Sequence, residues 1–205
     1  MRLCPRESRN DKISDEGKKQ KKMDPLEIIE RFYRPGTLAH RLLVSHSRKV
    51  AEKAVETAAR LKAGADEGFL YEAAMLHDIG IFLTDAPGLG CFGDRPYICH
   101  GYLGRELLEK EGLARHALVA ERHVGVGLTV KDIMEQKLPL PQRDMTPRSE
   151  AEIIICFADK FYSKGKDPER EKSVWEARLL VGRYGQDKLD IFDGWLKLFN
   201  PPVRP

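Results

Sequence analysis

The 205-residue sequence has few cysteines, no long apolar run and no strong excess of one charge. Its four cysteines, at positions 4, 91, 99 and 156, form no CxxC pair and are too few to cross-link a chain of this length, so we expect reduced thiols. No stretch approaches the roughly 18 apolar residues of a membrane span, and residues 1–22 lack the apolar centre of a signal peptide. These absences predict a soluble, cytoplasmic protein that does not enter a membrane.

The net charge of +3 comes from the first part of the chain. Residues 1–22 hold eight Lys or Arg against four Asp or Glu, which leaves 27 against 28 for residues 23–205. We therefore interpret residues 1–22 as a disordered or non-native tail, with Met23 as a candidate start, and expect no nucleic-acid partner for the nearly neutral remainder. A chain of this size and composition should bury one core, so residues 23–205 are expected to form one domain.

Apolar residues recur at helical spacing along most of the chain, and convincing β alternation is missing. The predicted fold class is therefore all-α. Residues 81–99 are rich in Pro and Gly, and we expect them to form a loop at the mouth of a pocket. The expected helices cover residues 26–32, 37–62, a segment ending at 77–78, 100–112, 113–123, 130–136 and 153–161, a helix starting at 167–168, and 187–199.

Six imidazole and carboxylate groups fall on or beside the apolar faces of these helices, and they are His46, His77, Asp78, His100, His123 and Asp159. A single His on an apolar face is usually a hydrogen-bonded core residue, and an Asp near a helix end is usually a cap. Asp159 fits this explanation poorly, because an unpaired carboxylate among Ile155, Cys156 and Phe157 costs several kcal/mol of desolvation. Lys160 projects about 100° away around the helix and is expected to be a poor partner, so a metal ion is the better explanation.

The order His46, His77-Asp78, Asp159 resembles the HD superfamily of metal-dependent phosphohydrolases, whose minimal pattern is His, His-Asp, Asp. The dyad continues as Ile79-Gly80, which is the variant that names the HDIG branch of the superfamily. His100 and His123 stand where members that bind two metals carry extra histidines. The resemblance covers roughly residues 37–164 and implies an HD-domain helical bundle, with the C-terminal helices completing the domain.

The resemblance also implies a site. His46, His77 and Asp159 would hold one divalent ion, His100 and His123 a second, and Asp78 would bridge them. His77 and Asp78 would be the catalytic dyad. Such mixed ligands suit Fe, Mn, Co, Ni or Zn, without choosing among them. The candidates for binding the phosphate of a small phosphorylated substrate are the cations nearest the ligands in sequence, namely Arg122, Arg143, Arg148 and Lys160.

The implied reaction is hydrolysis of a nucleotide-like or small phosphoester by a metal-activated water. Two alternatives stay open. The same ligands occur in di-iron oxygenases of the superfamily that act on a small polyol or phosphonate. A helical module of this kind could also be a non-catalytic sensor that binds a nucleotide without cleaving it. Members that cleave cyclic dinucleotides carry a Gly-Tyr-Pro signature and paired histidines, whereas His123 here is followed by Val124-Gly125. Cleavage of cyclic-di-GMP is therefore not expected.

His40 and His116 match no ligand position of the family. We expect both to be structural or exposed.

Overall fold

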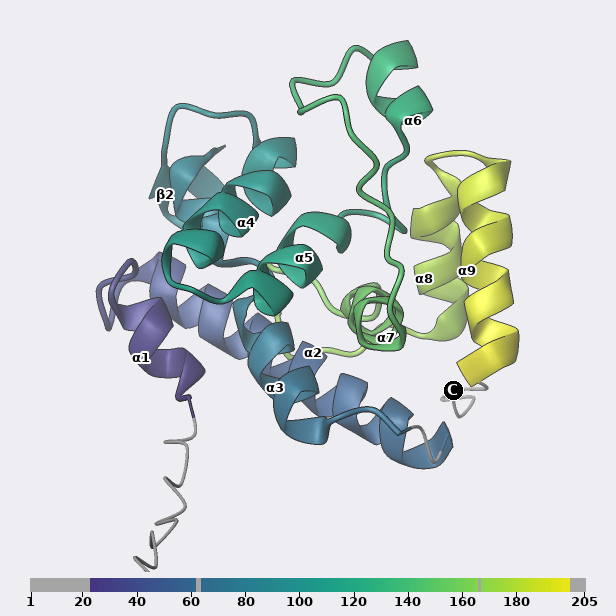
Figure 1. Cartoon of the computed structure of the whole chain (residues 1–205), viewed down its shortest axis with the longest axis horizontal. Helices are drawn as coiled ribbons and strands as arrows, with labels where there is room; N and C mark the ends of the chain where they lie inside the picture. Colours follow the sequence, from purple (N-terminus) through teal and green to yellow (C-terminus); the bar gives the residue numbers. More distant parts are fainter. Residues whose placement is uncertain (1–22, 62–63, 166, 200–205) are drawn as a thin grey trace, which may run out of the picture.

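The computed structural model describes residues 23–61, 64–165 and 167–199. The predicted tail, residues 1–22, lies outside the described residues, so this prediction remains untested. The described chain folds into helices with one two-stranded sheet, which confirms the all-α class (Figure 1). The α-helices are α1 (Pro25–Glu30), α2 (Leu38–Leu61), α3 (Glu67–Leu76), α4 (His100–Lys110), α5 (Ala114–Arg122), α6 (Val130–Glu135), α7 (Glu150–Asp159), α8 (Val174–Gly182) and α9 (Gln186–Phe199).

Most helices begin where a capping residue supplies an acceptor for a free backbone amide. The side chain of Asp24 accepts from the amide of Leu26 at the start of α1, and Ser149 accepts from that of Glu152 at the start of α7. The prediction that a helix starts at residues 167–168 was wrong. Asp167 caps only a turn, whereas α8 begins after Ser173, which forms a reciprocal capping box with Glu176.

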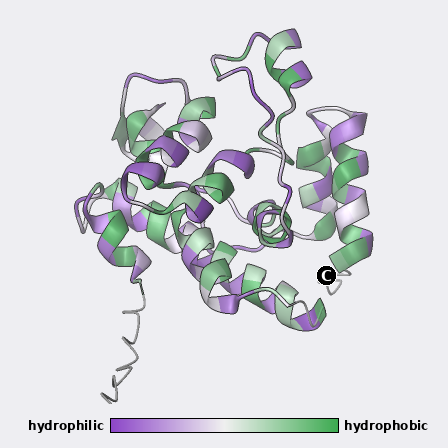
Figure 2. Ribbon diagram, viewed as in Figure 1, coloured by the Kyte–Doolittle hydropathy of each residue, from purple (hydrophilic) through white to green (hydrophobic). Residues whose placement is uncertain are grey.

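Helix α7 lies near the centre of the bundle, and it packs against α2, α3 and α5 (Figure 1). Its residues 154–158 are almost fully buried. The ring of Phe157 lies 5.6 Å from that of Phe192 and 4.8 Å from that of Phe199, so aromatic contacts attach α9 to the same core. Figure 2 shows hydrophobic and hydrophilic residues mixed along α2 and α3, as expected for helices with one buried face.

Residues 81–99, predicted to form a loop at the mouth of a pocket, contain short helical turns and a hairpin. This segment begins within the 3-10 helix η1 (Ile79–Leu83) and contains the 3-10 helices η2 (Pro87–Leu89) and η3 (Tyr97–Cys99) and a hairpin of β1 (Asp85–Ala86) and β2 (Cys91–Phe92). A Cβ at Gly93 would lie 2.1 Å from the carbonyl carbon of Leu83, so this close return of the chain requires glycine. The strands are too short to alter the fold class.

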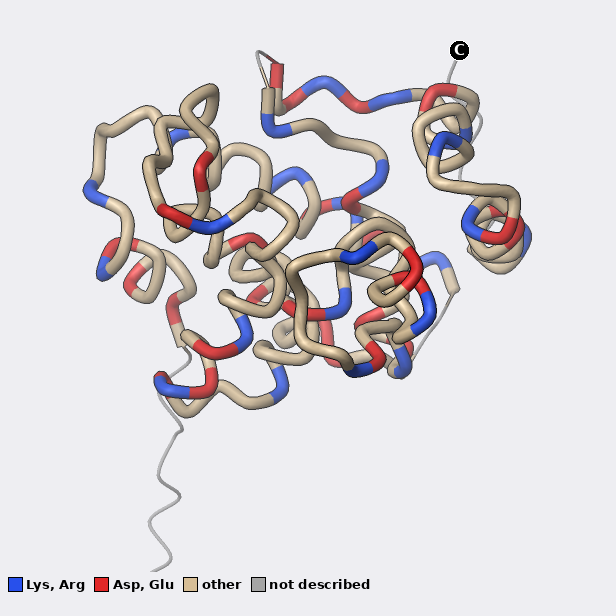
Figure 3. Tube along the Cα trace, turned by 90° about the horizontal axis from the view of Figure 1, so that it is seen from above, with Lys and Arg blue, Asp and Glu red and all other residues tan. Residues whose placement is uncertain are grey.

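Basic and acidic residues are interspersed over the helices (Figure 3). Among the described helices, none is both long enough and apolar enough to cross a membrane.

Candidate metal centre

The fold brings the six singled-out side chains to one buried place. Each comes from or directly beside the end of a helix, except His46, which lies within α2. At most 7% of any of these residues is exposed. They form two groups whose ligand atoms lie within 4.8 Å of one another, and the groups are His46, His77, Asp78 and Asp159, and Asp78, His100 and His123.

The first group faces inward through imidazole Nε2 atoms and carboxylate oxygens. His46 Nε2 lies 3.0 Å from Asp159 Oδ1 and 3.3 Å from Asp78 Oδ2. His77 Nε2 lies 3.1 Å from Asp78 Oδ2 and 3.6 Å from Asp159 Oδ1. Two nitrogens and two oxygens therefore surround one point.

The second group uses the other oxygen of the shared aspartate. Asp78 Oδ1 lies 3.2 Å from His123 Nε2 and 3.4 Å from His100 Nε2. The two Nε2 atoms lie 3.1 Å from each other. Because Oδ2 of Asp78 faces the first group and Oδ1 the second, this carboxylate is placed as a bridge between them.

In three of the imidazoles, a hydrogen bond from Nδ1 determines the orientation of the ring and therefore the direction in which Nε2 points. Nδ1 of His77 lies 2.6 Å from the carbonyl of Ala74, and Nδ1 of His123 lies 2.7 Å from that of Ala120. His100 makes the same contact with the carbonyl three residues before it, at 2.7 Å. Since a carbonyl can only accept, each Nδ1 donates its proton, and a neutral ring then presents Nε2 as a lone pair.

These assignments leave acceptors facing acceptors. Nε2 of His46 and His77 and Oδ1 of Asp78 are buried without a hydrogen-bond partner among the described residues. When His100 and His123 each carry their single proton on Nδ1, neither Nε2 atom has a proton with which to form a hydrogen bond to the other. Ligand atoms that converge in this way are best held together by a cation between them, so the residues fit divalent metal ions with nitrogen and oxygen ligands. Their role as ligands remains a prediction.

The pKa values of these groups follow from burial and from the two carboxylates. Burial alone lowers the pKa of His77, but the charges of Asp78 and Asp159 and their hydrogen bonds raise it to about 9. Burial and the neighbouring His123 lower the pKa of His100 to about 3, which keeps that ring neutral. The first group is thus a place of strong negative potential, which attracts a positive charge.

Two lysines partly offset this charge. Lys160 Nζ lies 2.8 Å from Asp159 Oδ2, so the expectation that Lys160 is a poor partner was wrong. The long side chain turns back across the end of α7 and also donates to the carbonyl of His123. Lys164 Nζ lies 2.9 Å from Asp78 Oδ2. Burial opposes charge on Asp78 and Asp159, yet the cations and imidazoles hold the pKa of each well below its usual range.

Gly80 lets the helix that carries His100 approach the dyad. A Cβ at Gly80 would lie 2.3 Å from the carbonyl oxygen of His100 and 2.5 Å from the amide nitrogen of Gly104. Only glycine allows η1 and the first turn of α4 to come this close. The glycine of the sequence motif therefore sets the distance between the two groups.

A cleft of about 620 Å³ opens onto the centre through His100, His123 and Asp159. Of the segment 81–99, which was expected to form its mouth, only Tyr97 and Ile98 line it. The rest of its wall comes from the chain after α5, the end of α7, and α8 and α9. Its cationic lining residues are Lys160, Lys164, Lys172, Arg183 and Lys188.

The predicted phosphate-binding residues are divided by the structure. Lys160 lines the cleft, but the three arginines do not. Arg122 binds both oxygens of Glu152 at 3.1 and 2.9 Å, and Arg143 pairs with the buried Glu121. Arg148 lies 3.4 Å from Asp144 at the surface, so nearness in sequence did not mean nearness in space. Phosphate binding by Arg122, Arg143 and Arg148 remains a prediction, and the positions of these three side chains do not favour it.

Sequence reasoning missed the four further cations of the cleft, because they come from the segment after α7 and from α8 and α9, which carry no ligand. Lys188 is already paired with Asp132 at 2.6 Å. The two histidines outside the ligand set lie elsewhere. His40 Nε2 is 3.6 Å from Glu30, and His116 packs edge-on against Phe69.

Residues 43–163 match the family described as HD domain, and this segment holds all six residues of the centre. An uncharacterized protein of Methanocaldococcus jannaschii is 34% identical over 145 residues, which cover 69% of this chain and 78% of that protein. A tRNA (cytidine(56)-2'-O)-methyltransferase of Thermoplasma volcanium is 31% identical over 155 residues, which cover 75% of this chain. The match spans only 41% of the length of that methyltransferase.

Among solved structures, the HD domain of the Listeria monocytogenes phosphodiesterase PgpH superimposes with a TM-score of 0.49 at 15% identity, covering 86% of this chain and 97% of that domain. The same domain in complex with cyclic-di-AMP gives 0.48 at 14% identity, covering 88% and 99%.

Proposed function

Because this chain belongs to the HD domain family, we propose that it is a metal-dependent phosphohydrolase that cleaves a nucleotide-like or other small phosphoester. The methyl transfer in the name of the Thermoplasma relative belongs to a protein more than twice as long as the matched segment, and we do not extend it to this chain.

The observation that carries the proposal is the set of converging acceptors at the bottom of a cationic cleft. The Nε2 atoms of four imidazoles and the oxygens of two carboxylates converge at one buried place, and several of them have no hydrogen-bond partner among the described residues. The cleft above carries five Lys or Arg side chains and one carboxylate, Asp159, among its lining residues. A negatively charged group is therefore favoured in the cleft, next to the place where divalent cations are favoured.

Each part of the site has a separate task. His77 and Asp78, with the other four ligands, would hold two divalent ions, which when bound lower the pKa of water and offset phosphoryl charge. The bond from each Nδ1 to its carbonyl orients His77, His100 and His123 so that each Nε2 faces the centre, where it would hold a metal ion. Lys160 keeps Asp159 ionised and lies where it can bind a phosphate oxygen.

The shape of the cleft supports a small organic substrate. Its volume of about 620 Å³ lies within the range of small-molecule sites. Ile98, Val126 and Leu180 give it apolar wall, while Tyr97 and Tyr184 add aromatic rings. A phosphate joined to an aromatic or apolar group, as in a nucleotide, matches both the charged and the apolar parts of the wall.

The first test is elemental analysis of protein purified without added metal, followed by assay on p-nitrophenyl phosphate and bis(p-nitrophenyl) phosphate. We expect up to two metal equivalents and release of nitrophenol. The double variant Asp78→Asn/Asp159→Asn should lose both metal and activity. Asp193→Asn changes a carboxylate that pairs with Arg178 and belongs neither to the centre nor to the lining of the cleft, and it should retain both.

A wild-type rate in the double variant would refute the proposal. Two other outcomes would replace it. Iron with a mixed-valence signal and oxygen uptake on a polyol or phosphonate would identify an oxygenase. Tight binding of phosphate analogues without turnover under any metal would identify a sensor.

A further inference from the structure

Two lysines reach the centre, and they contact different oxygens of its carboxylates. Lys160 contacts Oδ2 of Asp159, whereas the oxygen of Asp159 that faces His46 is Oδ1. Lys164 contacts Oδ2 of Asp78 at 2.9 Å, and this same oxygen lies 3.1 Å from His77 Nε2. Lys160 therefore pairs on the outer side of the cluster. Lys164 instead forms an ion pair with Asp78 Oδ2, which is one of the oxygens with which the first group would bind a metal ion.

An ammonium group and a divalent ion cannot share this oxygen without strong repulsion. Lys164 Nζ also lies 3.8 Å from Asp159 Oδ1, which is the second inward-facing oxygen of the first group. Like charges a few ångströms apart in a buried site repel strongly, because little water screens them. The binding of a metal ion by His46, His77 and the two carboxylates therefore requires the ammonium of Lys164 to leave, whereas that of Lys160 can stay.

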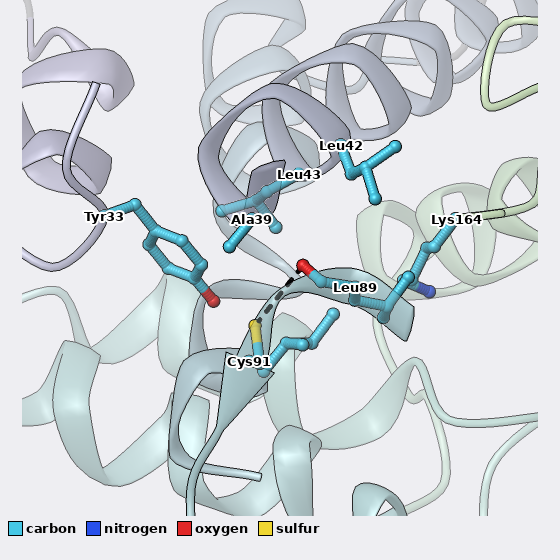
Figure 4. Close-up of a pocket in the computed structure, with 8 residues that line it drawn as sticks. Tyr33, Ala39, Leu42, Leu43, Leu89, Cys91 and Lys164 are labelled. Carbon is cyan, nitrogen blue, oxygen red and sulfur yellow. Dashed lines mark hydrogen bonds between the residues drawn. The ribbon is translucent and has the colours of Figure 1, made fainter. Parts of the chain in front are cut away.

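The spaces beside Lys164 show where its ammonium can go. On one side is a cavity of about 10 Å³, with Leu89 and Cys91 on its wall and Tyr33 on the side opposite the lysine (Figure 4). A cavity of this size holds about one water molecule, which is too little for a hydrated ammonium. On the other side Lys164 lines the cleft of about 620 Å³. The displaced group therefore enters the cleft.

We propose that Lys164 is an exchangeable counter-ion, which neutralises Asp78 in the metal-free protein and binds the substrate phosphate once metal has displaced it. The phosphate half of this proposal rests on the proposed function. The displacement half concerns metal binding alone and can be tested without any turnover.

The first experiment compares Lys164→Met with Lys160→Met by calorimetric titration with Mn²⁺ and, on the Mn²⁺-loaded protein, with inorganic phosphate. Lys164→Met removes the competing charge, so Mn²⁺ should bind about tenfold more tightly, the scale of one charge-assisted hydrogen bond. Phosphate should bind about tenfold more weakly, because a cation has left the cleft. Lys160→Met is the matched control for the metal titration and should not tighten Mn²⁺ binding, because Lys160 does not share an inward-facing oxygen.

The opposite signs of the two effects separate this role from a structural one, since general damage to the site weakens both ligands. Unchanged or weaker Mn²⁺ binding in Lys164→Met would overturn the displacement. Tighter Mn²⁺ binding with unchanged phosphate binding would overturn the phosphate contact.

A second experiment uses the wild-type chain and so does not depend on a variant that folds. Amine acetylation followed by peptide mass spectrometry should label Lys164 slowly in the metal-free protein, where its side chain is 18% exposed and paired. Saturating Mn²⁺ should raise that rate several-fold, and phosphate should lower it again. Lys131, with its side chain 76% exposed, is the reference and should not change. Bound Mn²⁺ with no change at Lys164 overturns this inference only, whereas failure to bind any metal overturns the proposed function itself.

Discussion

Replacing Gly80 by alanine should destabilise the chain and disturb one half of the centre more than the other. The added Cβ would lie 2.3 Å from the carbonyl oxygen of His100 and 2.5 Å from the amide nitrogen of Gly104, where nonbonded atoms normally stay about 3.5 Å apart. Both neighbours are backbone, so no side-chain rotation relieves the clash. The start of α4 must move by about 1 Å away from η1.

The cost can be bounded from overpacking in other cores, which is typically about 1–3 kcal/mol and occasionally more. Because the added Cβ would meet the rigid backbone of the first turn of α4, we expect a loss of about 3 kcal/mol in the free energy of unfolding, a large part of the roughly 5–15 kcal/mol of a whole domain. The same displacement carries His100 away from Asp78 and His123. The protein should therefore lose its second metal equivalent before its first.

Urea unfolding followed by circular dichroism measures the stability, and elemental analysis measures the metal. Gly104→Ala is a graded control in the same interface, since its Cβ would lie 3.3 Å from the amide nitrogen of Gly80 and require only a small adjustment. Gly194→Ala lies in α9 with nothing within 4 Å of its Cβ and should be neutral or stabilising by up to about 1 kcal/mol. If Gly80→Ala and Gly104→Ala cost the same, or if Gly80→Ala retains both metals at full stability, the reasoning fails.

Three further predictions concern charge and metal. Glu121 is fully buried between Arg105 and Arg143, so Glu121→Gln should lower the free energy of unfolding by about 2 kcal/mol in urea titrations, and a loss under 0.5 kcal/mol would contradict this. Burial and Arg115 lower the pKa of His116 to about 4, although Glu72 lies 3.6 Å away, so between pH 4 and 6.5 the unfolded chain binds more protons than the folded one. The stability of the wild type relative to His116→Leu should then rise with pH across that range and level off above it, and a constant difference would rule this out. Removing metal with a chelator should lower the thermal midpoint, and metal at 100 times its dissociation constant should restore about 2.7 kcal/mol, whereas an unchanged midpoint would show that the folded chain binds no metal.

The sequence was most informative where a local rule decides the structure. Capping residues and helical periodicity predicted α1, α2, α6 and α9 closely, because each begins at a strong start signal or a clear break. The six polar residues of the centre were recognisable because carboxylates and imidazoles on apolar helix faces need a partner. Their order along the chain then suggested that the partner is shared.

The errors arose where the outcome depends on distance in space. The Asp167-Pro168 pair resembles a helix start, but the capping box of Ser173 and Glu176 determines where α8 begins. Lys160 was judged by its position around the helix, although its long side chain can turn back to Asp159. The cations of the cleft, such as Arg183, come from the segment after α7 and from α8 and α9 and their connection, which reach the centre only after folding.

The hydrogen bonds that hold the imidazole rings have a consequence for how such a protein can diversify. Nδ1 of His77, His100 and His123 each bonds to the carbonyl three residues earlier, so the orientation of each ring depends on its own turn of backbone. Much of the cleft wall comes instead from connecting segments and from α8 and α9, which hold none of these rings. Substitutions in that wall can therefore change which substrate binds while the imidazole Nε2 atoms keep their orientation. Substrate specificity and metal binding can thus evolve independently of each other.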